Sequence, residues 1–146
     1  MKLLIFSLLL ACVSHASTLK EKGEIPPRTY VEELAKEADA ALRVRVKSIY
    51  LDSCKTCTST GKLYVIEAVI IKKYFDKGKH IKGKRIYYTS GADAVSTRSK
   101  DIIVFLNRTE RQDIGKYRSV AWAARQSTEF IYAPETASFI SGPDQR

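Results

Sequence analysis

The sequence predicts a mainly β (α+β) protein, a five-stranded OB-like Greek-key barrel with a short N-terminal helix. Three observations lead to this fold class. Five segments with strand patterns follow one another without a helix between them, a helical pattern precedes the first, and the second strand is apolar on both faces. Strands without βαβ alternation indicate an all-β or α+β domain, and a long bent strand is typical of a five-stranded barrel. These patterns leave a β-sandwich open as the alternative.

The first two predicted strands lie between Leu42 and Phe75 and organise the rest of the chain. From Leu42 to Lys47, apolar residues alternate with basic ones, which is the period of a strand with one buried and one wet face. From Leu63 to Ile71, both faces are apolar. Such a strand is either covered on both sides or bent, so that its halves serve different cores, as in a small closed barrel.

The other elements follow from shorter patterns. Thr29 and Glu32 have the spacing of a capping box, which predicts a helix from about Tyr30 to Ala40. Further strands are predicted at residues 84–89, 101–106 and 117–123, followed by a short segment at 129–133. They are separated by a loop at 52–61, glycine-containing turns at 76–83 and 107–116, and a small-residue loop at 90–100.

The N-terminus predicts export. Met1 and Lys2 begin a positive segment, an apolar run follows, and a small-x-small site ends at Ala16, which is the organisation of a secretory signal peptide over residues 1–16. The apolar run is too short for a permanent membrane span. The alternative is a lipoprotein signal with Cys12 as the lipidated residue. Both alternatives predict a secreted or extracytoplasmic protein.

The mature chain is predicted to form one domain. An extended lead-in at 17–28 precedes the OB-like domain at 29–133, and a C-terminal tail covers 134–146. The formal net charge of the full chain is +9, and it falls to +8 when the signal peptide, with its one lysine and no acid, is removed. A basic exported domain of this kind is a candidate for binding anionic partners.

Two of the three cysteines, Cys54 and Cys57, lie in the loop between the first two strands. In an oxidising compartment this pair is expected to form a local disulfide, with free thiols and metal or redox chemistry as the alternatives. A redox-active pair would begin a helix after a strand, but Thr-Ser-Thr-Gly follows Cys57. A zinc site would need two further ligands, and His80 is the one histidine of the mature chain. We therefore expect no metal and no other cofactor.

The sequence offers no catalytic constellation. The motifs His-Glu-x-x-His and Gly-x-Ser-x-Gly and a phosphate-binding loop do not occur in it. Acidic residues such as Asp39, Glu67 and Asp101 are scattered and form no pair suited to acid–base chemistry. His80 stands among lysines in a predicted turn, where a surface role is expected. The sequence therefore predicts a binding protein and not an enzyme.

A basic cluster is the main candidate binding site. Seven basic residues fall within one predicted strand–turn–strand segment, interleaved with aromatic residues: Lys72, Lys73, Lys77, Lys79, Lys82, Lys84 and Arg85. Such a surface binds polyanions by charge and stacking, and export favours a sulfated (anionic) glycan, lipopolysaccharide or an acidic protein over nucleic acid. The alternative is a solvated face that protects strand edges. Tyr87, Tyr88 and Trp122 are expected to be core or half-buried cover and not a ligand platform.

The sequence also contains one candidate modification site. Asn107-Arg108-Thr109 fits the N-glycosylation acceptor pattern and lies in a predicted turn. Glycosylation of Asn107 is expected only if the source is eukaryotic.

Four segments occur in the order found in one known family. They are Ala38 to Val46, with an Ala-Asp-x-x-hydrophobic-x-x-x-Val pattern, Lys73-Tyr74-Phe75 up to Gly78, Ile86 to Ser90, and Asp101 to Leu106. Together they resemble the opening strand, the basic-aromatic segment and two later barrel strands of the tissue inhibitors of metalloproteinases (TIMP) and the wider netrin-like group. The resemblance implies an OB-like barrel, which favours the barrel over the sandwich. It also implies a protein partner, such as a protease, bound through the barrel loops.

The chain departs from that family in the residues that inhibit proteases. The family coordinates the protease zinc through an N-terminal cysteine in a Cys-x-Cys start, whereas the predicted mature chain begins at Ser17. The family's framework disulfides are missing too, since only Cys54 and Cys57 remain. The resemblance thus implies a divergent, secreted, metalloproteinase-inhibitor-like binding protein that does not chelate zinc. Polyanion binding through the basic cluster is the alternative function.

Intact mass and N-terminal sequencing of the exported protein test these predictions about processing. We expect a mature chain that begins at Ser17, with Cys54 and Cys57 resistant to alkylation until a reductant is added. A lipid mass on Cys12 would contradict the predicted cleavage, and alkylation without reductant would contradict the disulfide.

Overall fold

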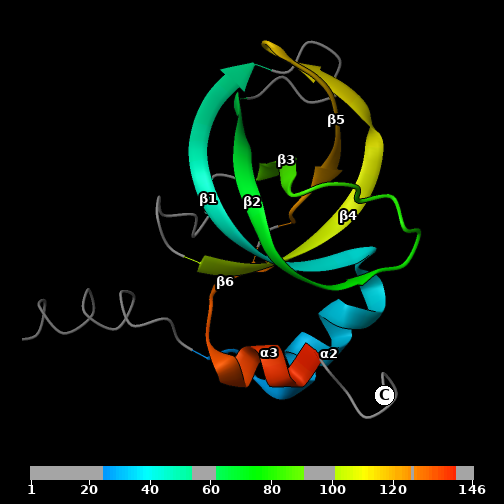
Figure 1. The fold of residues 1–146 in the computed structure, drawn as a ribbon, viewed down its shortest axis with the longest axis vertical. Coiled ribbons are helices and arrows are strands. Elements are labelled where there is room, and N and C mark those ends of the chain that lie inside the picture. Colours follow the sequence, from blue (N-terminus) through cyan, green and yellow to red (C-terminus); the bar gives the residue numbers. More distant parts are fainter. Residues whose placement is uncertain (1–24, 54–61, 91–100, 126, 141–146) are drawn as a thin grey trace, which may run out of the picture.

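The computed structural model describes residues 25–53, 62–90, 101–125 and 127–140 of the chain. Within these ranges the chain forms two helices and six strands (Figure 1). In chain order they are α2 (Arg28–Glu37), β1 (Ala40–Ser53), β2 (Lys62–Asp76), β3 (Arg85–Ser90), β4 (Asp101–Ile114), β5 (Tyr117–Ala123), β6 (Glu129–Ile131) and α3 (Pro134–Ile140). The predicted signal peptide, Cys12, Cys54 and Cys57 lie outside the described residues, so export and the disulfide stay predictions.

The described strands form one sheet that closes on itself. The strand order is β1-β2-β3-β5-β4, and β1 also pairs with β4, which makes a five-stranded barrel with β6 added beside β4. The pairings between these strands are antiparallel, except that β3 and β5 run parallel. The predicted fold class, a five-stranded OB-like Greek-key barrel with an N-terminal helix, is confirmed.

β1 closes the barrel because it pairs along both of its edges. On one edge it faces β4 from Ala40, opposite Leu106, to Arg45, opposite Asp101. On the other edge it pairs with β2 along its whole length to Ser53. Three register shifts along the β1–β2 ladder bend the two long strands, which is what a β-bulge does to an antiparallel pair.

β2 contributes to three separate hydrophobic clusters, which explains why both of its faces are apolar. Ile66 lies in the barrel core, Val65 packs in a second cluster with Ile114, and Phe75 packs in a third cluster beside the helices. Of the two interpretations of this strand, the structure supports the bent one, whose parts serve different cores.

The first half of β4 is buried on both faces for a similar reason. Ile102 and Val104 point into the barrel core, whereas Ile103 and Phe105 point outward into the cluster that α2 and α3 cover. The unbroken apolar run of this strand therefore reflects two cores, one on each side.

The two helices lie together at one end of the barrel (Figure 1). Val31 of α2 and Ile140 of α3 are buried in the cluster that also holds Phe105. Tyr30 extends this contact, because its hydroxyl donates a hydrogen bond of 2.9 Å to the carbonyl of Ser127. Within the described ranges, no helix has the length and hydropathy needed to cross a bilayer.

The start of α2 differs from the sequence prediction. The residue before the helix is Pro27, and no side chain caps the helix, so the capping box predicted from Thr29 and Glu32 is wrong. Instead, the Arg28 guanidinium lies 2.7 Å from the Glu32 carboxylate one turn later. The helix was predicted to end near Ala40. It ends at Glu37, and β1 begins at Ala40.

The charged segment after Leu106 also differs from its prediction. It was predicted as a turn over 107–116, but β4 continues to Ile114 and the turn is limited to Gly115 and Lys116. The segment was not predicted as a strand because its residues are mostly polar and show no alternation with apolar ones. This half of β4 is largely exposed, and its register shifts twice against β5. Asn107 therefore lies in a strand, opposite Ala123, and its glycosylation stays a prediction.

The end of the described chain is a helix and not the predicted tail. α3 occupies the first part of the predicted tail at 134–146, and its Thr136 and Ile140 are buried. Two features of the sequence are typical of a helix start: Pro134 stands at the first helical position, and Glu135 lies in the first turn.

Asp101 links β1 and β4 at the point where the barrel closes. Its carboxylate lies 2.6 Å from Arg43 Nη2 and 2.8 Å from Arg45 Nε, and Arg43 also stacks on the Tyr132 ring at 3.6 Å. Burial acts to raise the pKa of the Asp101 carboxyl, but the hydrogen bonds and charges of Arg45 and Arg43 outweigh it and hold the pKa below its usual value. The carboxylate is therefore stabilised in its charged form.

Replacing Asp101 with Asn should destabilise the fold by about 1–3 kcal/mol at pH 7, because two arginines lose a charged acceptor. Because the pKa of the Asp101 carboxyl is lowered in the folded protein, its full contribution to the free energy of unfolding is present above the unfolded-state pKa of about 4. This contribution is lost as the pH falls through the folded-state pKa. Denaturant unfolding of wild type and Asp101→Asn should therefore converge in acid. Glu110→Gln, on the exposed half of β4, is the control; equal loss in both variants at pH 7 would contradict this role.

Candidate functional site

The barrel wall is joined least between β3 and β5. These strands share one pairing, Thr89 with Ala123, supported by a backbone hydrogen bond of 2.8 Å from the Ala124 N–H to the Thr89 carbonyl. β3 and β2, by contrast, pair at six successive positions. The first part of β3 and the first part of β5 are therefore separated, and a seam opens in the wall.

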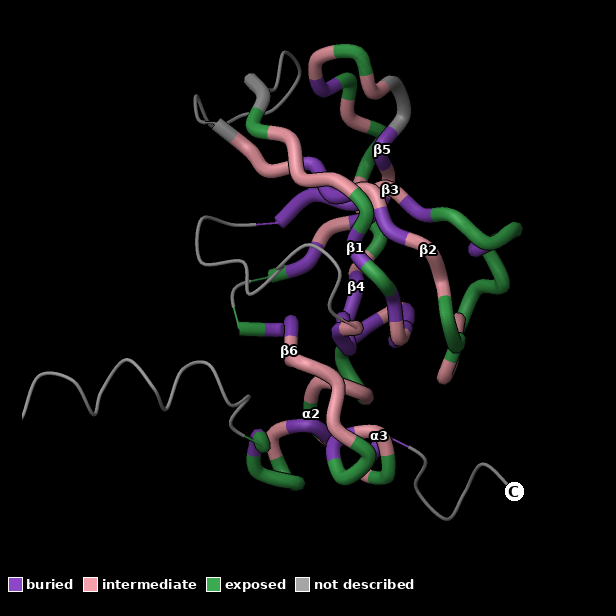
Figure 2. The backbone as a smooth tube through the Cα atoms, turned by 60° about the vertical axis from the view of Figure 1, so that its left-hand side comes forward, coloured by how far each residue is buried: buried purple, intermediate pink, exposed green. Residues whose placement is uncertain are grey.

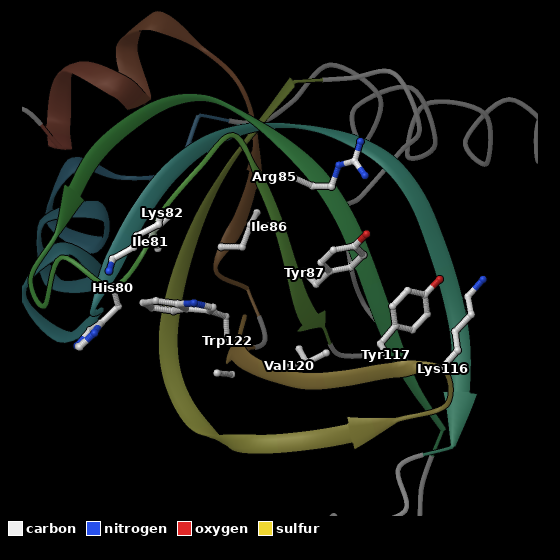
Figure 3. Close-up of a pocket in the computed structure, with 11 residues that line it drawn as sticks. His80, Ile81, Lys82, Arg85, Ile86, Tyr87, Lys116, Tyr117, Val120 and Trp122 are labelled. Atoms are coloured by element: carbon white, nitrogen blue, oxygen red, sulfur yellow. The ribbon is translucent and has the colours of Figure 1, made fainter.

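A groove of about 400 Å³ occupies this seam (Figure 3). We refer to it as the seam groove, and its lining comes from the β2–β3 connection, β3, the β4–β5 turn and β5. The lining residues are His80, Ile81, Lys82, Arg85, Ile86, Tyr87, Lys116, Tyr117, Val120, Ala121 and Trp122. Its volume falls within the roughly 300–1,000 Å³ range of small-molecule sites.

The lining of the seam groove is basic. Among the described residues it contains Lys82, Arg85, Lys116 and His80 but no aspartate or glutamate. Glu67, next to the groove, approaches Arg85 at 3.4 Å, but the Arg85 side chain remains 63% exposed. In Figure 3, His80 and Trp122 lie at one end, Lys116 and Tyr117 lie at the other, and Arg85 lies on the rim between them.

The β2–β3 connection folds back so that its residues reach the groove. The Asp76 carboxylate accepts a hydrogen bond of 2.7 Å from the Ile81 N–H, and the Asp76 carbonyl accepts one of 3.1 Å from the Lys79 N–H. A Cβ at Gly78 would overlap the His80 ring, so any other residue there would force this ring to move. These constraints place Ile81, which is 9% exposed, in the barrel core and its neighbours His80 and Lys82 at the groove.

Aromatic rings form the walls of the seam groove. The Tyr117 ring lies 5.5 Å from Tyr87 and 4.9 Å from Tyr50, and the Lys116 ammonium lies over the Tyr50 and Tyr117 rings at 5.1 and 5.4 Å. Such cation–π contacts favour a position of Lys116 beside the groove. Trp122, at the other end, is only 9% exposed, so it forms wall and core together.

The Tyr117 hydroxyl is a buried polar group at this site. Its oxygen makes no hydrogen bond of good geometry with the described residues, although it interacts with the Tyr50 hydroxyl. Burial raises the pKa of this hydroxyl above its usual value, because the phenolate form would lose its hydration, and the interaction with Tyr50 raises the pKa further. Tyr117 therefore stays neutral at pH values where exposed tyrosines ionise.

The structure brings two members of the predicted basic cluster, Lys82 and Arg85, into the seam groove. The others lie outside its lining, mostly along an exposed strip from the end of β2 to β3 (Figure 2). Two of these make backbone contacts: Lys77 Nζ donates to the Lys36 carbonyl at 2.7 Å, and Lys73 Nζ lies 3.5 Å from the Ile81 carbonyl. The remaining three, which are exposed, are Lys72, Lys79 and Lys84.

The sequence analysis missed part of this site. Lys116 and Tyr117 were placed in a turn and at the start of a strand, with no link to the basic cluster about 30 residues earlier. The expected core role is confirmed for Tyr88, which is fully buried. Tyr87 is half-buried and Trp122 is nearly buried, as expected, but both line the groove.

Neither a metal site nor a relative identifies the groove's ligand. Within the described ranges, no group of three or more His, Cys, Asp and Glu side chains is placed to hold a metal ion. A scan against models of protein families and a search of curated proteins both found no match to this chain.

Two tyrosine-to-phenylalanine variants test how the buried hydroxyls are satisfied. Tyr117→Phe should leave the free energy of unfolding unchanged or raise it by up to about 1 kcal/mol, because it removes a buried hydroxyl that makes no hydrogen bond of good geometry. Tyr88→Phe should lower it by about 1–3 kcal/mol, because the Tyr88 hydroxyl donates a buried hydrogen bond of 3.0 Å to Glu129. Denaturant unfolding measures both values, and a larger loss for Tyr117→Phe would contradict this description.

Proposed function

We propose that this protein is a non-catalytic binding protein that holds an anionic ligand in the seam groove. One observation carries the proposal: Lys82, Arg85, Lys116 and His80 line one groove, and no carboxylate of the described part of the chain is among its lining residues. Three chain segments supply these side chains, and the barrel brings them together. A patch of one charge sign in a concave site attracts and concentrates ligands of the opposite sign.

The groove also has features beyond charge. Its lining includes Ile86 and Val120, which are 5% and 4% exposed. A site with an apolar floor and a few polar groups is typical of specific ligand binding. The volume of about 400 Å³ suits a short stretch of a longer polyanion, not a whole polymer.

This proposal modifies the expectation of polyanion binding by the whole basic cluster. It keeps Lys82 and Arg85, adds Lys116 and His80, and gives the exposed Lys72, Lys79 and Lys84 a lesser, non-specific role.

The resemblance to the TIMP and netrin-like group also predicts an inhibitor-like protein interface on the barrel loops. Two of those loops, at 54–61 and 91–100, lie outside the described residues. The interface stays a prediction, and the seam groove is the site that the described residues favour.

Two triple variants that remove equal charge test the proposed function. The groove variant is Lys82→Gln, Arg85→Gln, Lys116→Gln, and the matched control is Lys72→Gln, Lys79→Gln, Lys84→Gln. A sulfated oligosaccharide titrated at several salt concentrations serves as the probe. We expect the groove variant to bind at least about tenfold more weakly than wild type, roughly 1.4 kcal/mol, and the control to lose much less. The slope of log affinity against log salt should also fall in the groove variant, since fewer counterions are displaced.

Equal weakening of the two variants would show that net charge alone attracts the probe, and the proposal would then be wrong. Thermal unfolding of both variants is the control for the fold. All six positions are exposed at the surface, so little change in stability is expected.

A further inference from the structure

The edge of β3 that faces the seam carries backbone groups that no other described strand pairs with. The Lys84 carbonyl accepts a hydrogen bond of 2.8 Å from the Ile70 N–H of β2. Residues of an antiparallel ladder alternate between facing the partner strand and facing away from it. Arg85, Tyr87 and Thr89 therefore direct their N–H and C=O groups away from β2.

Of these three residues, Thr89 is the one that meets β5. Its carbonyl accepts the hydrogen bond from Ala124, and the single β3–β5 pairing is at this position. Within the described ranges, the backbone groups of Arg85 and Tyr87 have no strand partner on the seam side. Unpaired edge groups of this kind are a template for an added strand.

The side chains around this edge divide by polarity. Ile86 points into the barrel core, and Val120 and Trp122 complete an apolar floor. Arg85, Lys82 and Lys116 are exposed around it. Because side chains of an extended chain alternate in direction, a segment along this edge would direct every second residue to the floor and the others to the basic rim.

We propose that the ligand of the seam groove is an extended acidic segment of a partner protein, which adds along the free edge of β3. Its backbone would pair with Arg85 and Tyr87, an apolar side chain would rest on Ile86 and Val120, and carboxylates would meet Lys82, Arg85 and Lys116. This inference rests on the proposed anion-binding function and names its partner. Strand addition of this type derives affinity from main-chain hydrogen bonds and specificity from alternate side chains.

A sulfated glycan accounts for fewer of these observations. Its charges would match the basic rim, but it has no main chain of consecutive amide N–H and C=O groups at the spacing of a strand to pair with Arg85 and Tyr87. Its hydroxyl groups would also lie against the apolar floor formed by Ile86 and Val120, where they lose water without gaining partners.

Synthetic peptides test the inference without altering the protein. The first is an eight-residue peptide of alternating glutamate and valine, and the second is polyglutamate with the same number of charges. Two more copies of the first peptide are N-methylated, one at each valine and one at each glutamate. N-methylation keeps the charge and removes the N–H donors along one edge of the extended peptide. Binding is measured by calorimetry, and backbone amide exchange is followed by NMR.

We expect the alternating peptide to bind at least tenfold more tightly than polyglutamate, and at least one N-methylated copy to bind tenfold more weakly. The Arg85 and Tyr87 amides should exchange at least tenfold more slowly in the complex. Equal affinity for all four peptides, or unchanged exchange at both amides, would overturn the inference.

A sulfated oligosaccharide is tested in parallel to separate this inference from the proposed function. If it binds with the groove dependence expected above while the peptides do not bind, strand addition is wrong and the anion-binding function stands. If neither probe depends on Lys82, Arg85 and Lys116, both proposals are wrong.

Discussion

The double pairing of β1 is the constraint on which the rest of the structure depends. One edge of this strand pairs with β4 and the other with β2, so the sheet closes at β1. Bulges bend the β1–β2 ladder, and Asp101, held by Arg43 and Arg45, ties β4 to β1 where they meet. Bent strands in turn let β2 and β4 supply more than one core.

The seam lies across the barrel from this closure. Parallel β3 and β5 meet at one pair of residues, and the connections that lead into them supply the basic side chains of the groove. Core residues such as Ile86 and Trp122 reach the floor and wall of the groove because no strand of the described ranges covers them there. The candidate site therefore lies where β3 and β5 are little paired, opposite the strand that closes the barrel. The paired strands on either side hold its residues in place.

Much of the fold was predictable because its signals are local. The alternation from Leu42 to Lys47 predicts β1, and the two apolar faces of 63–71 predict a strand that is either covered on both sides or bent, of which the bent form is observed. Where prediction failed, tertiary contacts overrode local composition. Polar residues 107–114 form a strand because β5 pairs with them, and α3 forms where its Ile140 packs beside Val31 of α2.

The candidate site was predictable only in part, for the same reason. Lys82 and Arg85 belong to a cluster that is visible in the sequence, but Lys116 joins them through the path of β5 across the seam. The spacing of residues along the chain does not indicate that Lys116 lies near Lys82 and Arg85. The division of the basic residues into groove and exposed strip likewise depends on the turn that Asp76 and Gly78 shape.

Trp122 is the one tryptophan of the chain and lies at one end of the seam groove, so it reports directly on the central claim. The most direct measurement is its indole N–H resonance during titration with an anionic ligand that binds the protein. Binding in the groove predicts that this resonance shifts in proportion to occupancy, together with the backbone amide of Lys116 at the other end. A saturating ligand that leaves both resonances unchanged, while shifting those of Lys79 and Lys84, would place binding on the exposed strip and contradict the account.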